Sequence, residues 1–221
     1  MKQKPKLLIA TNNKGKLAEF QAILQGLEIE LVLPADIGLE LDVEEDGQTY
    51  AENATKKALA FSQTSGLTSL ADDSGLEVDA LDGAPGLHSK RFGPSPPLTL
   101  PPFSKKMGGA GGGLADADRR AYLLEQLSGK PRPWVARFRA TVAVASPQRG
   151  VKLVEGICPG EIIPEERGQG GFGYDPIFLL KDLGKTMAEL EMDEKNRLSH
   201  RGLAVREALP ILRDFLGLEE I

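Results

Sequence analysis

The stretch LLIATNNKGKLAEF, residues 7–20, decides the fold class of this 221-residue chain. Its first four residues, 7–10, are apolar and predict a short buried strand. A polar loop, TNNKGK at residues 11–16, follows directly. Apolar residues then recur at helical spacing, at Leu17, Phe20, Ile23, Leu24 and Leu27. The chain therefore opens as strand, polar loop and helix, a unit typical of α/β folds.

Strand and helix patterns keep alternating after this opening. Strands are predicted at residues 29–33, 67–71, 76–81, 137–145, 151–157 and 177–180. Helices are predicted at residues 50–65 and 116–127, with a helical turn at 187–190. A final helix is expected from Ser199, which would cap it, and Pro210 should kink or restart that helix. A hairpin turn at 147–150 makes one strand pair antiparallel, so we expect an α/β fold with a mixed sheet.

A Pro- and Gly-rich segment interrupts this alternation at about residues 94–114, with PSPPLTLPPF and GGAGGG. Such a composition predicts a flexible insertion within a single domain of residues 1–221. GGAGGG lacks the Lys-Ser/Thr pair and the preceding strand of a nucleotide-binding P-loop, so a linker is the better interpretation.

The composition excludes several classes of protein. The net charge of −5 argues against binding to nucleic acid, and the apolar run near the N-terminus is too short for a signal peptide or a membrane span. We therefore expect a cytoplasmic protein with no membrane partner. Two His and one Cys, Cys158, disfavour a zinc site and an internal disulfide. Any metal should be a hard cation held by carboxylates.

The polar loop is the first candidate site. Backbone N–H groups at a helix N-terminus attract phosphate, Gly15 permits close approach and Lys16 supplies a positive charge. An ordinary polar turn explains Asn12, Asn13 and Gly15 equally well.

Two carboxylates, Asp72 and Asp73, form the second candidate site, and residues 72–75 are expected to form a turn after a buried strand. Neighbouring like charges repel, and a divalent cation shared with substrate phosphates would remove that cost. Glu44, Glu45 and Asp46 precede this segment, and read alone they indicate a solvated acidic turn.

The third candidate site combines the segment Phe172-Gly173-Tyr174-Asp175 with Lys195 and Ser199-His200-Arg201. Aromatic rings beside glycines can stack on a flat base, and the charged residues can read the edge of that base. Judged alone, a packed Gly-rich hairpin and a capped helix start are the simpler interpretations.

Six ordered segments together give a more specific signal. They are IATNNKGKLAEF, EEDGQTYAENATKKA, LADDSGLEVDALDGAPGLHSKRFG, FRATVAVASP, GEIIPEERGQGGFGYDPIF and KTMAELEMDEKNRLSHRG. The chain resembles the inosine/xanthosine triphosphate pyrophosphatase family along nearly its whole length. The resemblance implies an elongated mixed sheet with flanking helices, two lobes around a central cleft, a homodimer and dependence on Mg²⁺. It also implies hydrolysis of ITP, dITP and XTP to the monophosphate and pyrophosphate, by attack of water on the α-phosphorus.

The resemblance assigns a role to each matching residue. Asp73 matches the proton acceptor and metal ligand, Asp72 supports it, and Glu44, counted back from Gly47, matches the second metal ligand in preference to Glu45. The triphosphate should be bound by Thr11, Asn12, Asn13, Lys14, Gly15, Lys16 and Lys57. The remaining substrate-binding positions are Ser74, Phe172, Gly173, Tyr174, Asp175, Lys195, His200 and Arg201.

The chain also departs from the family pattern. The Pro/Gly segment is longer than expected, Lys90 replaces a small residue, and Arg119-Arg120 stand where Asn is common. Two alternatives stay open: a related pyrophosphatase for pyrimidine or modified nucleotides, and a non-catalytic nucleotide-binding module. Intact Lys16, Lys57 and the acidic pair speak against the second.

Overall fold

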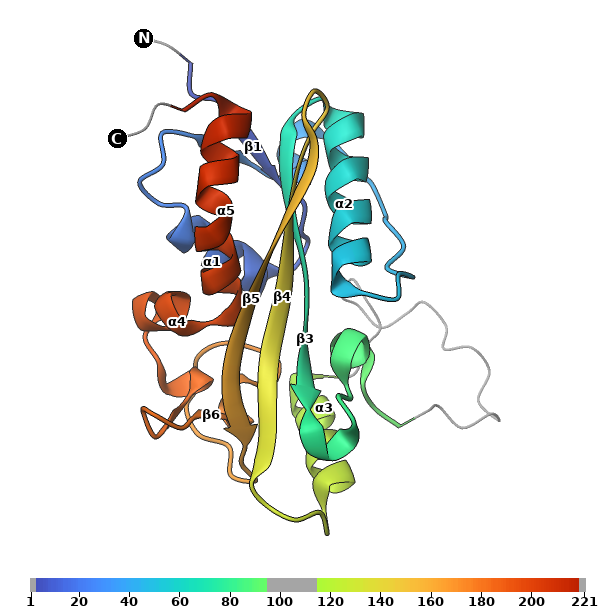
Figure 1. Cartoon of the computed structure of the whole chain (residues 1–221), viewed down its shortest axis with the longest axis vertical. Helices are drawn as coiled ribbons and strands as arrows, with labels where there is room; N and C mark the ends of the chain where they lie inside the picture. Colours follow the sequence, from blue (N-terminus) through green and yellow to red (C-terminus); the bar gives the residue numbers. More distant parts are fainter. Residues whose placement is uncertain (1–2, 95–114, 219–221) are drawn as a thin grey trace.

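The computed structural model describes residues 3–94 and 115–218. It contains a seven-stranded sheet in the order β2-β1-β3-β4-β5-β6-β7 (Figure 1). The strands are β1 (Lys6–Ile9), β2 (Glu30–Val32), β3 (Thr68–Val78), β4 (Trp134–Ser146), β5 (Gly150–Ile162), β6 (Phe178–Leu180) and β7 (Lys185–Thr186). β1 is parallel to β2 and β3, and all other pairs are antiparallel, which confirms the mixed sheet.

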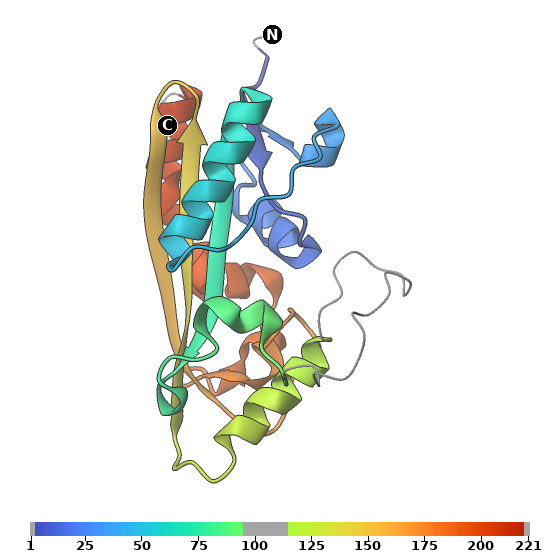
Figure 2. The same cartoon turned by 90° about the vertical axis from the view of Figure 1, so that its right-hand side faces the viewer.

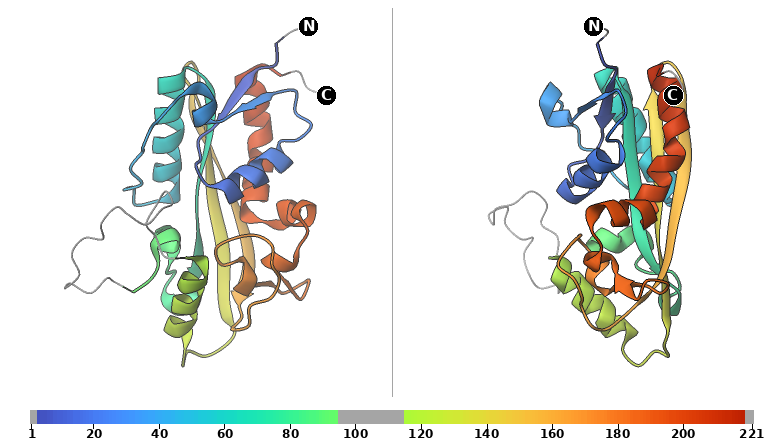
Figure 3. Two further views of the ribbon diagram at one scale, coloured as in Figure 1. Left: turned by 180° about the vertical axis from the view of Figure 1, so that it is seen from behind. Right: turned by 90° about the vertical axis from the view of Figure 1, so that its left-hand side faces the viewer.

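Helices cover both faces of the upper part of the sheet. The α-helices are α1 (Lys14–Ile23), α2 (Tyr50–Ser65), α3 (Asp116–Leu127), α4 (Met192–Leu198) and α5 (His200–Leu216). Short 3₁₀ segments are η1 (Pro34–Ile37), η2 (Asp79–Leu81), η3 (Gly86–Arg91), η4 (Asp175–Ile177) and η5 (Met187–Glu189). α1 and α5 share one apolar cluster with the sheet, and α2 packs on the opposite face. Figures 1 and 3 show α5 and α2 on either side of the long strands.

The long strands β3, β4 and β5 join two lobes (Figure 2). The upper lobe has an apolar cluster on each sheet face, built from β1, α1, α2 and α5. A third cluster fills the lower lobe, where α3 and the segment around β6 pack against the lower ends of the long strands. The candidate site residues Asp72 and Asp73 lie on β3, one of the strands that join the lobes.

The expected turn at residues 72–75 is wrong. β3 is one continuous strand, and Asp72 to Gly75 pair with Val142 to Arg139 of β4. The ladder satisfies the backbone groups that face β4, Lys57 donates to the Asp72 carbonyl on the other edge, and positively charged side chains compensate the buried Asp72 carboxylate. Acidic residues next to a glycine favour a turn locally, but pairing with β4 overrides that preference.

Most other predicted elements agree with the structure. The helices at 50–65 and 116–127 have the predicted bounds, and the hairpin at 147–150 joins two strands that are longer than predicted. Ser199 caps α5 by accepting a hydrogen bond from the Gly202 N–H at 3.1 Å. α5 runs through Pro210 without a restart. The predicted insertion falls almost wholly on residues 95–114, which lie outside the described residues.

Within the described ranges, no helix is both long enough and apolar enough to cross a membrane.

Candidate functional site

The site begins where β1 ends beside the longer β3. β1 pairs with β3 as far as Ile9 opposite Leu70, and the Ala10 N–H donates to the Leu70 carbonyl at 2.8 Å. Beyond Leu70, β1 no longer pairs with this edge of β3. Here a side chain bonds the backbone instead, because Lys57 Nζ donates to the Asp72 carbonyl at 2.6 Å. Because side chains alternate along a strand, Asp72 and Asp73 project to opposite faces of the sheet. The two carboxylates therefore meet different helices.

Asp72 lies on the face covered by α1 and α5. Its Oδ2 is 3.0 Å from Lys16 Nζ and accepts hydrogen bonds from Arg201 Nε at 3.0 Å and Ser74 Oγ at 3.3 Å. The residue is only 2% exposed. Burial alone would raise the Asp72 pKa, but the charges of Lys16 and Arg201 hold it well below its usual range. Burial in turn lowers the Lys16 pKa, and Asp72 opposes that shift. The polar loop at residues 11–16, the candidate phosphate loop, thus lies beside the acidic pair.

Asp73 lies on the face covered by α2. Its Oδ2 accepts from Asn53 Nδ2 at 2.9 Å, and its Oδ1 accepts from the Ser74 N–H at 3.0 Å. Burial raises the Asp73 pKa, and the nearby Lys57 charge opposes the shift. Asn53 Oδ1 also accepts from the Gly47 N–H at 2.8 Å, which ties the acidic loop to α2. Asp73 is therefore a buried carboxylate whose hydrogen-bond partners fix its orientation.

Of the two adjacent acidic residues, Glu45 is the one that pairs with Lys57, whereas Glu44 was the expected metal ligand. Glu45 Oε1 is 2.8 Å from Lys57 Nζ, and its charge raises the Asp73 pKa. Both side chains are exposed, that of Glu45 at 42%, but the charge of Glu44 acts on the solvent-facing Lys56. Backbone direction in this extended segment decides which of two adjacent carboxylates faces inward, and counting from Gly47 does not reveal it.

The phosphate loop caps α1. Asn13 Oδ1 accepts from the Lys16 N–H at 3.1 Å, and Thr11 Oγ1 accepts from the Asn13 N–H at 3.2 Å. Helix α1 starts at Lys14, so Lys14, Gly15 and Lys16 form its first turn, where backbone N–H groups carry partial positive charge. Asn12 and Lys14 are exposed, and Asn12 borders a hollow of about 610 Å³ beside residues 34–42.

Glu19 is a buried site residue that the sequence reasoning missed. It is 2% exposed, its Oε1 is 2.7 Å from Lys195 Nζ, and its Oε2 accepts from Arg201. Burial would raise the Glu19 pKa, but Arg201 and Lys195 lower it. One signal was available: Glu19 follows Lys16 by three residues, so both lie on one helix face.

Phe172 brings the aromatic segment to the phosphate loop. A Cβ on Gly15 would lie 2.6 Å from Phe172 Cδ1, so only glycine fits at that position without a shift of the ring. Lys195 Nζ lies 5.0 Å and Arg201 Cζ 5.8 Å from the centroid of the same ring. The ring is thus bordered by α1 on one side and by two cations on the other.

Asp175 and Tyr174 fix the shape of this aromatic segment. Asp175 Oδ2 accepts from Lys195 Nζ at 2.7 Å and from the Phe172 N–H at 2.9 Å. Burial raises the Asp175 pKa, and Lys195 opposes the shift. The Tyr174 hydroxyl donates to the Ser89 carbonyl at 2.9 Å. The segment is therefore held by its own side chains and by the region before the insertion.

His200 offers a free nitrogen at the same junction. Its ring stacks on Phe138 with centroids 4.8 Å apart and planes at 16°. Burial and the Arg201 charge place the His200 pKa well below its usual range, so the ring is neutral at pH 7. Within the described part of the chain, its Nδ1 is buried without a hydrogen-bond partner. A buried unpaired nitrogen is costly, and a ligand atom would satisfy it.

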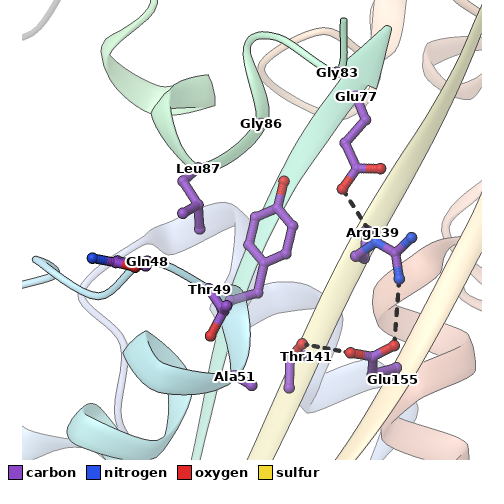
Figure 4. Close-up of a pocket in the computed structure, with 11 residues that line it drawn as sticks. Gln48, Thr49, Ala51, Glu77, Gly83, Gly86, Leu87, Arg139, Thr141 and Glu155 are labelled. Carbon is purple, nitrogen blue, oxygen red and sulfur yellow. Dashed lines mark hydrogen bonds and ion pairs between the residues drawn. The ribbon is translucent and has the colours of Figure 1, made fainter. Parts of the chain in front are cut away.

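A separate hollow of about 520 Å³ opens below the N-terminus of α2 (Figure 4). Glu77 and Glu155 hold Arg139 there at 3.1 and 3.4 Å, and Thr141 donates to Glu155 at 3.5 Å. None of the predicted site residues lines this hollow. The site at the edge of β3 is therefore the one that gathers the predicted residues.

Known proteins are similar to this chain along nearly its whole length. The Ham1 family model matches residues 7–211. The chain is 44% identical to a dITP/XTP pyrophosphatase of Desulforamulus reducens, over 98% of this chain and 100% of that protein. It is 43% identical to a dITP/XTP pyrophosphatase of Geobacter sulfurreducens, over 98% of each chain.

Solved structures agree with this relationship. A HAM1 protein from Coxiella burnetii superposes with a TM-score of 0.78 and 36% identity, covering 95% of this chain and 99% of that one. The Staphylococcus aureus Ham1 protein superposes with a TM-score of 0.77 and 33% identity, covering 95% and 98% of the two chains. With its sheet order, its acidic strand and its capped lysine loop, this chain belongs to the Ham1 family.

Proposed function

We propose that this protein hydrolyses deaminated purine nucleoside triphosphates, ITP, dITP and XTP, to the monophosphate and pyrophosphate. One observation carries the proposal: the capped loop of α1 places Lys16 Nζ 3.0 Å from Asp72, and Lys57 reaches the backbone of the same strand. Two lysines and a helix N-terminus beside a buried acidic pair suit a triphosphate and a cation. Relatives at 44% and 43% identity bear the name dITP/XTP pyrophosphatase, which supports the substrate class.

We propose Mg²⁺ as the cofactor. Among residues 3–94 and 115–218, no cluster of three or more His, Cys, Asp or Glu side chains is arranged to hold a metal by itself. Asp73 and Glu45 supply the carboxylate oxygens that Mg²⁺ prefers, and phosphate oxygens of the substrate would complete its ligands. Asp72 Oδ1, buried and without a partner in the described ranges, offers a further oxygen to an ordered water. The bound ion would neutralise phosphate charge and lower the pKa of water.

This assignment of Glu45 is testable against Glu44. Glu45→Gln should raise the Mg²⁺ concentration for half-maximal activity roughly tenfold or more, because a metal-binding carboxylate becomes a weaker amide ligand. Glu44→Gln is the matched control and should behave as the wild type, since the charge of Glu44 acts on the solvent-facing Lys56. Rates of pyrophosphate release over a Mg²⁺ titration give the answer. If only Glu44→Gln raised the Mg²⁺ concentration for half-maximal activity, the metal-ligand role would belong to Glu44.

Asp73 is the proposed proton acceptor. Its burial and raised pKa suit a general base, and Asn53 fixes its orientation. In the reaction, the oxygen of water forms a bond to the α-phosphorus while its proton passes to Asp73. The bond from the α-phosphorus to the bridging oxygen breaks, and pyrophosphate leaves. Lys16 and Lys57 offset the negative charge that develops on it.

Selectivity is proposed to arise at the base edge. Hypoxanthine and xanthine present an acceptor oxygen at C6, which the third N–H of Lys195, beyond its bonds to Glu19 and Asp175, can satisfy. Adenine presents an amino group there and would leave that buried N–H unpaired, a difference on the order of a thousandfold or more. His200 Nδ1, buried and unpaired within the described residues, is positioned for a further polar contact with the base.

A substrate panel tests the function. Purified protein with Mg²⁺ should convert dITP, ITP and XTP to monophosphate and pyrophosphate, and should act weakly on ATP and GTP. Preference for a pyrimidine or modified nucleotide would favour the related pyrophosphatase. Release of diphosphate and orthophosphate would mean attack at the γ-phosphorus and overturn the mechanism. Binding without turnover would favour the non-catalytic module.

We further propose a cytoplasmic homodimer. The β4–β5 hairpin exposes Val135, Leu153 and Ile157 on one sheet face, at 42%, 43% and 40% exposure, which supports a contact there. A sedimentation mass equal to one chain would rule the dimer out.

A further inference from the structure

We propose that helix α3 is a positioning device for the nucleotide site, through Asp116 and Arg120, which hold the two backbone polar groups of Gly173. This inference rests on the proposed function for its effect on catalysis, but the contacts themselves can be tested without a substrate. Asp116 and Arg120 are one helical turn apart on α3, in the lower lobe. Both therefore face the aromatic segment together.

The contacts from α3 bond both the N–H and the carbonyl of Gly173, and together they are called the grip. Asp116 Oδ2 accepts from the Gly173 N–H at 2.7 Å, and Arg120 donates from its terminal guanidinium nitrogen to the Gly173 carbonyl at 2.9 Å. A charged partner makes each bond stronger than a bond between neutral groups. Among residues 3–94 and 115–218, no strand pairing includes Gly173, which lies between β5 and β6 with a φ of +63°. Its position therefore depends on these side chains.

Arg120 is itself oriented by a second residue. Its Nε and its other terminal nitrogen donate to the two carboxylate oxygens of Glu166 at 2.8 and 2.9 Å. This two-point pairing fixes the plane of the guanidinium and directs the remaining nitrogen at Gly173. Asp116 is oriented in the same way, since its Oδ1 pairs with Arg119. The grip is thus preorganised before any nucleotide binds.

Gly173 transmits this grip to the nucleotide site through its neighbour. Phe172 precedes it directly, and the Phe172 ring packs against Gly15 and lies 5.0 Å from Lys195 Nζ. Asp175 holds the inner side of the same turn by accepting from the Phe172 N–H. The turn is therefore held from inside by Asp175 and from outside by α3. Loss of the outer contacts should let the Phe172 ring move relative to the phosphate loop.

The first test needs no substrate. Hydrogen exchange of a peptide covering residues 171–175 should be at least tenfold faster in Asp116→Ala than in the wild type, because the Gly173 N–H loses its acceptor. Asp116→Asn should restore slow exchange, since an amide oxygen still accepts. The Asp116 side chain is 40% exposed, so truncation leaves the core intact. Unchanged exchange in Asp116→Ala would overturn the inference whatever the enzyme does.

The second test uses dITP. Asp116→Ala and Arg120→Ala should raise KM roughly tenfold and change kcat less than twofold, because the nucleotide site is misplaced while Asp73 is untouched. Arg120→Lys should fall between Arg120→Ala and the wild type. Glu166→Gln should show a weaker effect of the same kind, and its neighbour Glu165→Gln is the matched control. An equal fall in kcat for every variant with KM unchanged would overturn the positioning role.

The two proposals fail in different ways. A wild-type protein that hydrolyses none of the triphosphates refutes the proposed function, and the exchange experiment still decides whether α3 anchors the turn. A wild-type enzyme that is active beside variants with unaltered KM refutes the positioning role alone.

Discussion

Asp73→Asn is expected to abolish pyrophosphate release, with a fall in kcat of about a thousandfold or more, while the fold stays intact. The variant amide has almost the same shape and keeps one acceptor oxygen for either Asn53 or the Ser74 N–H, which both donate to the native carboxylate. It cannot take a proton from water at neutral pH. General bases contribute roughly 10²–10⁴-fold, and loss of a metal ligand adds to that factor.

The comparison requires a folded protein and a neutral control. Circular dichroism and thermal unfolding should give wild-type curves, because removal of one buried charge with a raised pKa does not destabilise the sheet. Asp79→Asn is a suitable control, since Asp79 is 49% exposed at the lower end of β3, where it pairs with Arg137. Near-full activity of Asp73→Asn in dITP hydrolysis would remove Asp73 from its catalytic role.

Asp72→Asn is expected to have the largest effect on stability. The Asp72 carboxylate serves both Lys16 and Arg201 in a site that is 2% exposed. Its removal leaves two buried cations without their shared anion, and breaking a buried pair in this way costs about 3–5 kcal/mol. For a domain of this size that corresponds to a fall in Tm of roughly 6–20 °C.

Several measurements test the expected loss of stability in Asp72→Asn. Glu45→Gln removes a partner of Lys57 that is 42% exposed, so it should cost no more than about 1 kcal/mol. Added pyrophosphate should reduce the difference in Tm between Asp72→Asn and the wild type, because its phosphate oxygens replace the lost negative charge. Since the folded-state pKa of Asp72 is lowered, its contribution is present above about pH 4 and is lost as pH falls further. Equal Tm values for Asp72→Asn and Glu45→Gln would contradict the shared-anion interpretation.

Local sequence patterns predicted the elements with strong periodicity. The helices at Tyr50–Ser65 and Asp116–Leu127 and the cap at Ser199 follow from apolar spacing and short-range hydrogen bonding alone. The chain opening gave the first strand and helix, although α1 starts at Lys14, before its first apolar residue. These features depend on residues within one or two helical turns of each other, which a linear pattern records directly.

Strand pairs and charge pairs between residues far apart in the sequence were not predicted from local patterns. A turn was expected at residues 72–75 because two carboxylates and a glycine favour one locally, yet β4 pairs with that segment throughout. Glu19 was not singled out from the sequence, yet Lys195 and Arg201 from the C-terminal helices pair with it in the buried site. Glu45 and Glu44 are adjacent and chemically identical, and only the path of the backbone selects which of them pairs with Lys57.

By itself, the sequence determined the fold class, the order of most elements and which residues are the candidates for binding phosphate and accepting a proton, since these follow from spacing and side-chain chemistry. The tertiary structure alone decided that β1 stops short beside β3, that the acidic pair is split between two sheet faces, and that α3 holds Gly173. Those outcomes depend on charges and hydrogen-bond groups that meet across distant parts of the chain. Burial makes these long-range contacts energetically important, and no local sequence pattern specifies which distant residue will form them.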